Sequence, residues 1–144
     1  MTWEDLTESE KGYIAGFLDG EGSICIHRGT NHISISFYNT YKQVIDWIAY
    51  AIKTKTVLRT VDKRRDKAHT KNNYVCYIKR QSDVYKFLND ILPYLKVKHE
   101  QAKLGIKFLE VKMNRHNRNF TQEQKDLQIF YANEMSRLNK GGKN

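Results

Sequence analysis

Apolar residues recur at two different spacings along this chain, and each spacing predicts a different kind of element. Residues 41–53 and 82–92 carry apolar side chains three or four positions apart, which indicates amphipathic helices. Residues 23–28 and 32–38 alternate apolar and polar side chains, which indicates strands. The link of residues 29–31 between them has the length and composition of a hairpin turn.

The remaining segments complete an α+β pattern. A helix is expected at the N-terminal end, where Thr7 and Glu10 form a capping box. The predicted order is helix, two strands, helix, two strands, helix and then further helix, in a single domain of residues 1–144. The other predicted elements are helices at 8–19, 96–113 and 121–138, strands at 55–63 and 73–80, and a frayed tail at 139–144.

The alternation in the first two strands gives the predicted sheet one apolar face and one polar face. Ile24 and Ile26 point one way in the first strand, and Ile33, Ile35 and Phe37 do so in the second. A sheet of this kind packs its helices on the apolar side only. The polar side is therefore left open for a polar partner.

Charge indicates what that partner is. The chain has 25 Lys and Arg against 16 Asp and Glu, a net charge of +9, which favours a polyanion. A basic connector at residues 64–72 is either solvated or a phosphate-binding loop. Cys25 and Cys76 lack the spacing of a zinc site or a disulfide framework. Without a long apolar run or a signal peptide, an intracellular, reducing location and no membrane partner are expected.

The helix at residues 8–19 carries too many glycines for an ordinary surface helix. Gly12, Gly16 and Gly20 recur every four residues and share one face, although each costs about 1 kcal/mol of helix stability relative to alanine. This pattern predicts that another backbone comes very close. We expect Gly20 and Gly22 to adopt positive φ at the helix exit. If an identical helix pairs here, two Glu21 carboxylates converge and would bind a divalent cation.

The polar sheet face suits the major groove of duplex DNA, where base edges carry a distinguishable code. The alternatives are an ordinary solvated face and an RNA-binding module that stacks bases on Tyr38 and Tyr77. Candidate DNA contacts are Ser23, Cys25, His27, Arg28, His32, Ser34, Ser36, Tyr38, Arg59, Val61, Lys63, Arg64, Arg65, Lys67, Lys71, Tyr77 and Lys79.

Residues 13–22, which read YIAGFLDGEG, resemble the LAGLIDADG motif of homing endonucleases. Residues 92–98, LPYLKVK, resemble a second segment found in single-motif, homodimeric members of that family. The resemblance extends over most of the chain, to about Gln101. One feature differs, because the motif's second acid is Glu21 where aspartate is commoner.

This resemblance implies an αββαββα fold with a saddle-shaped antiparallel sheet in the DNA major groove. It also implies a homodimer that cuts both strands of a long pseudo-palindromic site and leaves short 3′ overhangs. Mg²⁺ is the implied cofactor, with no small-molecule cofactor, and Ca²⁺ is expected to bind without supporting cleavage. A maturase or regulator of the same fold that binds nucleic acid without cutting it is the alternative.

The resemblance also implies roles for individual residues. Glu21 and the Gly20 carbonyl would bind the metal, and Lys98 would assist the water and the scissile phosphate. Asn39 is the candidate for the water network, and Lys42 or Gln43 for a supporting contact. Asp19 matches the motif's first acid, whose role is structural. The expected dimer-interface residues are Gly12, Tyr13, Gly16, Phe17 and Gly20.

Overall fold

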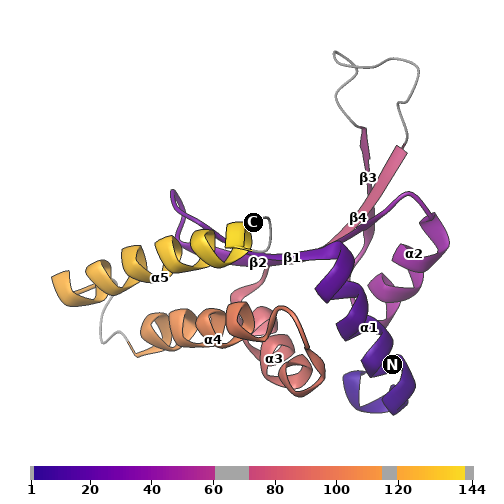
Figure 1. The fold of residues 1–144 in the computed structure, drawn as a ribbon, viewed down its shortest axis with the longest axis horizontal. Coiled ribbons are helices and arrows are strands. Elements are labelled where there is room, and N and C mark those ends of the chain that lie inside the picture. The colour runs from indigo at the N-terminus through magenta and orange to yellow at the C-terminus, as the bar shows by residue number, and fades with distance from the viewer. Residues whose placement is uncertain (1, 61–71, 115–119, 142–144) are drawn as a thin grey trace. The chain divides into compact units, whose positions relative to one another are not determined.

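A computed structural model describes residues 2–60, 72–114 and 120–141 of the chain (Figure 1). Its strands form a four-stranded antiparallel sheet in the order β1-β2-β4-β3, and the predicted α+β class is confirmed. The strands are β1 (Gly22–His27), β2 (His32–Asn39), β3 (Thr56–Thr60) and β4 (Asn72–Ile78). The helices are η1 (Trp3–Asp5), α1 (Glu8–Glu21), α2 (Lys42–Ala51), α3 (Gln81–Ile91), η3 (Leu92–Tyr94), α4 (His99–Met113) and α5 (Gln122–Gly141).

The chain divides into two compact units. The first unit consists of Met1–Ser23 and Ser36–Ile78, and the second consists of Ile24–Ile35 and Lys79–Asn144. The first unit thus holds α1, α2, β3 and β4, and the second holds α3, α4 and α5. Strands β1 and β2 contribute residues to both units. The single domain expected from chain length stays a prediction.

In the first unit, α1 starts where the sequence predicts. Thr7 Oγ1 accepts a hydrogen bond from the Glu10 amide at 3.1 Å, and Glu10 Oε1 accepts from the Thr7 amide at 2.9 Å. This confirms the capping box. The helix buries Ile14, Ala15 and Leu18 and leaves its other face exposed.

Helix α2 packs against β3 and β4 in the same unit (Figure 1). Its buried stripe includes Ile45 and Ile48, as the periodicity predicts. A polar contact adds to this packing, because the Thr56 hydroxyl of β3 donates to Asp46 Oδ1 at 2.6 Å. Lys42 donates to the other oxygen of Asp46 at 2.7 Å, and these two hydrogen bonds, Lys42 foremost, hold the pKa of Asp46 below its usual value.

In the second unit, α4 lies against both α3 and α5 (Figure 1). Gly105 allows the close approach: a Cβ there would lie 2.7 Å from Ile33 Cδ1 and 2.9 Å from Leu88 Cδ1. The buried residues Phe108 and Met135 belong to the core of this unit. None of the helices in the described ranges is long and apolar enough to cross a membrane.

Several predicted boundaries are wrong. Helix α1 continues to Glu21, two residues beyond the predicted end. Helix α4 starts at His99 and not at residue 96, because Leu92–Tyr94 forms the separate short helix η3 and Leu95 is extended. Strand β4 ends at Ile78, so Lys79 lies just beyond it.

The C-terminal boundary also differs from the prediction. Helix α5 extends to Gly141, so residues 139–141 are helical and not frayed. Asn139 explains part of this, because its side-chain amide donates to the Ile24 carbonyl of β1 at 3.0 Å. The last three residues of the predicted tail, 142–144, lie outside the described residues.

Candidate active site and nucleic-acid interface

The candidate acid, Glu21, is the last residue of α1, and its side chain is exposed. The following residue, Gly22, closes the helix by donating its amide to the Leu18 carbonyl. The expectation of positive φ at Gly20 and Gly22 is wrong: no glycine in the described ranges has positive φ, and Gly22 is extended at φ −120°. Gly22 is needed for space instead, because a Cβ there would lie 2.6 Å from Leu18 Cδ1 and 2.8 Å from the Ser36 carbonyl oxygen.

Asn39, at the end of β2, is the partner of Glu21 in the first unit. Its Nδ2 donates to Glu21 Oε2 over a long 3.4 Å, and its Oδ1 accepts from the Tyr41 amide at 2.8 Å. The second bond forms an Asx turn, in which an asparagine side chain bonds the backbone two residues further on. The sequence alone did not predict this contact, although Asn39-Thr40-Tyr41 directly before a helix is a signal for the Asx turn. The structure therefore brings two predicted site residues together.

The other candidates of the first unit differ in their surroundings. Gln43 is exposed in the first turn of α2. Lys42 is paired with Asp46. Asp19, for which the family resemblance implies a structural role, is half-buried in α1.

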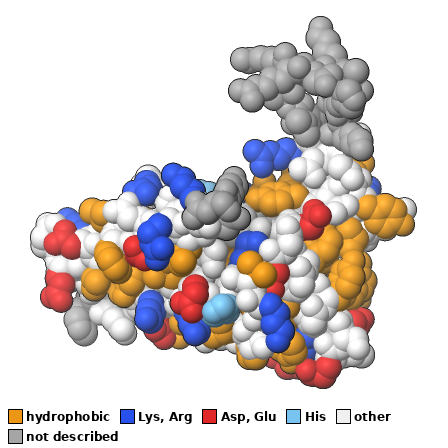
Figure 2. Space-filling view, viewed as in Figure 1, with side chains coloured by type: hydrophobic (Ala, Val, Ile, Leu, Met, Phe, Trp, Pro, Cys, Tyr) orange, Lys and Arg blue, Asp and Glu red, His pale blue; other side chains and the backbone are white. Residues whose placement is uncertain are grey.

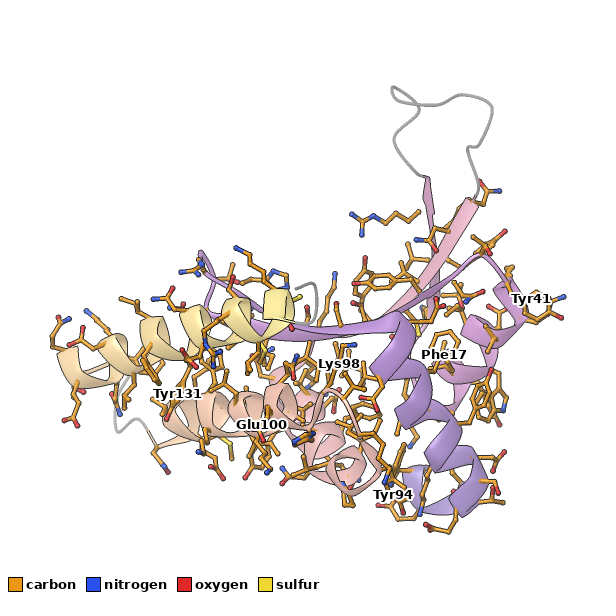
Figure 3. All side chains as sticks on the ribbon, viewed as in Figure 1. Phe17, Tyr41, Tyr94, Lys98, Glu100 and Tyr131 are labelled. Carbon is orange, nitrogen blue, oxygen red and sulfur yellow. The ribbon has the colours of Figure 1, made fainter. Side chains whose placement is uncertain are left out.

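The glycine face of α1 is open. No atom lies within 4 Å of a Cβ built at Gly12, Gly16 or Gly20, outside the helix's own backbone. Tyr13 on the same helix is 53% exposed, and its ring packs edge-on against that of Trp47, with 5.8 Å between the ring centroids. Phe17 is half-buried (Figure 3), with its ring centroid 6.3 Å from that of Phe37. This surface has the room that the predicted dimer interface requires.

Three hydroxyl groups of the first unit meet where β1 begins and β2 ends. Ser23 Oγ lies 2.8 Å from Ser36 Oγ and 2.7 Å from Tyr38 Oη, and Ser36 donates to Tyr38 at 2.8 Å. Ser23 and Tyr38 are half-buried, whereas Ser36 is only 5% exposed. Ser36, expected among the residues of the free polar face, is therefore buried. Alternation alone could not show this, because Ser34 has the same parity and is half-buried.

Strands β3 and β4 carry further candidates in the first unit. Arg59 is exposed and pairs across the sheet with Asn73, which has the same strand parity as Tyr77. Arg59 and Tyr77 therefore lie on one face of the sheet. The candidates Val61, Lys63, Arg64, Arg65, Lys67 and Lys71 lie outside the described residues.

The second unit holds the remaining candidates. His27 and Ser34 are joined by a 2.8 Å hydrogen bond across β1 and β2, and Arg28 donates to Asn133 of α5. His32 and Lys79 are exposed, and Cys25 is half-buried with a thiol outside any disulfide. Lys98 is half-buried as the N-cap residue of α4 (Figure 3), and its carbonyl accepts from the Ala102 amide at 3.0 Å. Lys98 and Glu21 belong to different units.

Among the described residues, one chain supplies too few oxygen ligands for a complete metal site. No group of three or more His, Cys, Asp and Glu side chains gathers within the described ranges. Glu21 offers one carboxylate, and the Gly20 carbonyl lies in the last helical turn, where carbonyls have no partner within the helix. Such oxygen ligands suit Mg²⁺ or Ca²⁺, which take six or more ligands and complete the set with water, phosphate or a second chain.

On the face shown in Figure 2, the Lys and Arg side chains of α4 and α5 are interspersed with Asp and Glu. The exposed ion pair of Arg137 with Glu134 at 2.9 Å is one example on α5. The view therefore shows no uniformly basic surface on these two helices.

Comparison with known proteins gives a sequence relative but no family model. No family model matches the chain. DNA endonuclease I-CreI of Chlamydomonas reinhardtii is 29% identical over 105 residues, which cover 68% of this chain and 61% of I-CreI. The chain therefore matches about three-fifths of that relative's length.

Solved structures of other proteins have a similar fold over about nine-tenths of this chain. Homing endonuclease I-CvuI, bound to DNA in the presence of Ca, has a TM-score of 0.64 and 18% identity over 90% of this chain and 82% of its own. A second DNA complex of I-CvuI, in the presence of Mg, has a TM-score of 0.65 and 18% identity over 91% of this chain and 82% of I-CvuI. The archaeal, intron-encoded I-Vdi141I bound to DNA has a TM-score of 0.66 and 17% identity over 91% and 84%.

The chain has the homing endonuclease fold. The resemblance predicted from residues 13–22 and 92–98 is thereby confirmed. Within the homing endonuclease fold, Glu21 and Asn39 now have a defined mutual geometry, which the sequence could not supply.

Proposed function

We propose that this chain is a sequence-specific DNA endonuclease that acts as a homodimer. It cuts both strands of a long pseudo-palindromic site by Mg²⁺-dependent hydrolysis and leaves short 3′ overhangs. The observation that carries the proposal is an exposed carboxylate, Glu21, at the end of a helix whose glycine face is open. Pairing of two such helices gives each half of the dimer an acid beside the two-fold axis.

The metal proposal follows from the oxygen ligands at the end of α1. Glu21 and the Gly20 carbonyl would hold the cation together with DNA phosphate oxygens and water. A bound Mg²⁺ supplies Lewis acidity toward the scissile phosphate and lowers the pKa of attacking water. The DNA complexes of I-CvuI in the presence of Ca and Mg support the use of divalent cations by this fold.

The proposed roles of the protein's other residues follow from their chemistry. Asn39 orients the Glu21 carboxylate through its hydrogen bond to Oε2. The Lys98 ammonium would stabilise charge that develops on the phosphate or assist the attacking water. Gln43, exposed on α2, would contact the water network.

The DNA-binding proposal rests on charge and on the sheet. A net charge of +9 supplies attraction to phosphates that does not depend on sequence. Arg59 and Tyr77 extend one face of the β3–β4 pair, where base edges or phosphates would be met. The DNA complexes of I-CvuI and I-Vdi141I support a duplex as the partner. We place the protein in a reducing, intracellular compartment, since Cys25 and Cys76 are both thiols.

The proposal is tested by incubating the protein with a randomised duplex library and Mg²⁺, and then sequencing the new ends. We expect one family of cut sites with two-fold symmetry and short 3′ overhangs. Glu21→Gln should abolish cutting while duplex binding in Ca²⁺ persists, because the amide keeps the size of the side chain but loses the charge that holds the metal.

The matched control is Glu8→Gln, which removes a carboxylate from the other end of the same helix. Glu8 is exposed and pairs at the surface with Lys11 at 3.5 Å, far along the helix from Glu21, so cutting should continue. Continued cutting by the Glu21 variant would refute the metal assignment. Tight, site-specific binding by the unaltered protein without any cutting in Mg²⁺ would favour the maturase or regulator alternative.

A further inference from the structure

The hairpin tip, residues 27–32 between β1 and β2, belongs to the second unit and faces solvent. Its sequence, HRGTNH, contains one arginine and two histidines and no carboxylate. Every residue of the tip is exposed except Asn31, which is half-buried. His27, Arg28 and His32 are candidate DNA contacts, so the position of the hairpin tip bears on which base pairs the protein prefers.

A two-stranded hairpin is only marginally stable by itself, so its tip needs support from other elements. Gln81, the first residue of α3, supports β2. Its Oε1 accepts from the Ile33 amide at 3.0 Å, and its Nε2 donates to the Ile33 carbonyl at 2.8 Å. The side-chain amide thus bonds one residue of β2 as the backbone of a neighbouring strand would. Because Ile33 is 0% exposed, loss of Gln81 would deprive a donor and an acceptor of a buried residue of these partners.

Two further helices hold the turn. Lys112 of α4 donates its Nζ to the Asn31 carbonyl at 2.8 Å and lies 3.4 Å from Gln81 Oε1. Helix α5 lies beside the hairpin (Figure 1), and Gln128 Oε1 accepts from the Asn31 side chain at 3.0 Å. Asn31 adopts φ 53°, the left-handed conformation that asparagine tolerates better than most residues. Side chains of α3, α4 and α5 therefore fix the backbone on the β2 side of the hairpin tip.

We propose that Gln81 and Lys112 are positioning residues for DNA recognition, which hold the hairpin tip in its binding position before the duplex arrives. The inference rests on the proposed function and names residues that set base preference without touching a base. A segment that must be ordered during binding costs affinity, and a segment fixed beforehand avoids that cost. A fixed tip also holds its side chains to one geometry, which sharpens the distinction between base pairs.

The test begins with selection of binding sites from a randomised duplex library in Ca²⁺, which avoids the need for cleavage. His27→Ala, Arg28→Ala and His32→Ala each remove one exposed side chain and identify the tip base pairs, those at which the preference changes. The other base pairs of the half-site serve as an internal reference. If none of the three variants changed the preference at any base pair, the hairpin tip would read nothing and the proposal would be overturned.

Gln81→Met is the central variant, because methionine keeps the length of the side chain and loses both hydrogen bonds to Ile33. We expect the preference at the tip base pairs to fall about two- to tenfold, the range for side chains that must be ordered during binding. The preference at the reference base pairs should stay unchanged. Hydrogen exchange of the Ile33 amide in the free protein should become faster, which measures the loosened hairpin without DNA.

Two control variants on α3 separate positioning from a general loss of stability. Asn89→Leu also removes a side-chain amide, which donates to the Tyr85 carbonyl of the same helix at 2.8 Å. Ile91→Val removes a methyl group from a fully buried residue and so destabilises the core. Both variants should keep the full preference at the tip base pairs. If Gln81→Met behaved like Ile91→Val, with intact preference or an equal loss at every base pair, its role would be structural only.

Lys112→Met separates positioning from direct contact with a phosphate. A positioning role predicts a lower preference at the tip base pairs and an unchanged dependence of affinity on salt. A lysine that binds phosphate would instead reduce the slope of log affinity against log salt by about 1.8 in a homodimer, with base preference intact. That second result would overturn the role proposed for Lys112.

The outcomes separate this inference from the proposed function. Failure of the unaltered protein to select any duplex would refute the proposed function. Selection of a site, together with a folded Gln81→Met variant that keeps its full preference at the tip base pairs, would refute the positioning role alone.

Discussion

Asn39 shows how one side chain can set the geometry of a candidate catalytic group. Its Oδ1 is held by the Tyr41 amide, which leaves Nδ2 to face Glu21. The amide nitrogen donates to Oε2 alone, so the two carboxylate oxygens are not equivalent. Glu21 is exposed and one methylene longer than aspartate, and a neighbour that limits its rotation lowers the entropy lost when a cation binds.

Cys76 gives a prediction at the same scale. This thiol of β4 is 0% exposed, and burial raises its pKa from 9.0 to about 12. Between these values the unfolded chain loses the proton while the folded chain keeps it. The free energy of unfolding should therefore decrease above pH 9.0, by up to about 1.4 kcal/mol per pH unit from this group.

Urea unfolding at pH 8, 9 and 10 measures this slope. Cys76→Val, which fills a similar volume without a titrating group, should show a smaller alkaline loss than the unaltered protein. Cys25→Ala is the control, because Cys25 is half-buried and the variant keeps Cys76. Identical slopes in all three proteins would show that Cys76 does not carry the effect.

At the scale of elements, local signals in the sequence predict that the helices and the hairpin exist and in which order they follow. The capping box placed the start of α1, and alternation placed β1 and β2 within a residue or two at each end. The role of Gly22 could not be found in this way, because the neighbours that forbid a Cβ include the Ser36 carbonyl, which is distant in sequence. Ser36 is a similar case, because its buried hydroxyl bonds Ser23, which lies 13 residues earlier in the chain.

The glycine face of α1 gives the prediction at this scale. Gly16→Leu should prevent dimer formation, because the bulky side chain would stand between two helices that need close contact. Within one chain the space is open, and leucine favours a helix over glycine by nearly 1 kcal/mol. The variant should therefore be a folded monomer with full helical content.

Sedimentation velocity and circular dichroism check the two halves of this expectation. Gly29→Leu is the matched control, since Gly29 also has nothing within 4 Å of a Cβ but lies outside α1. It should remain dimeric. An unchanged dimer in Gly16→Leu would place the interface elsewhere, whereas loss of helix would show that the substitution damages the fold.

At the scale of the whole molecule, the order of elements was predictable because each has its own period. The sequence could not predict which residues far apart in the chain belong to the same compact unit. The sequence indicates Glu21 and Lys98 through two separate motifs, and the structure assigns them to different units. Charge is a property of the whole chain that sequence does give, and the surplus of 25 basic over 16 acidic residues bears directly on duplex binding.

That surplus predicts a steep dependence of DNA affinity on salt. In Ca²⁺, log affinity should fall linearly with log salt, with a slope of about 0.9 for each phosphate contact. Because each substitution in a homodimer alters both copies, replacing one phosphate-binding cation should reduce the slope by about 1.8. Arg59→Gln is the variant of choice, since this side chain is exposed on β3.

Lys86→Gln on α3, where Lys86 pairs with Asp90 at 2.7 Å, is the matched control and should leave the slope unchanged. A fall near 0.9 would mean that only one copy binds through Arg59, and an unchanged slope with altered base preference at one position would make Arg59 a base contact.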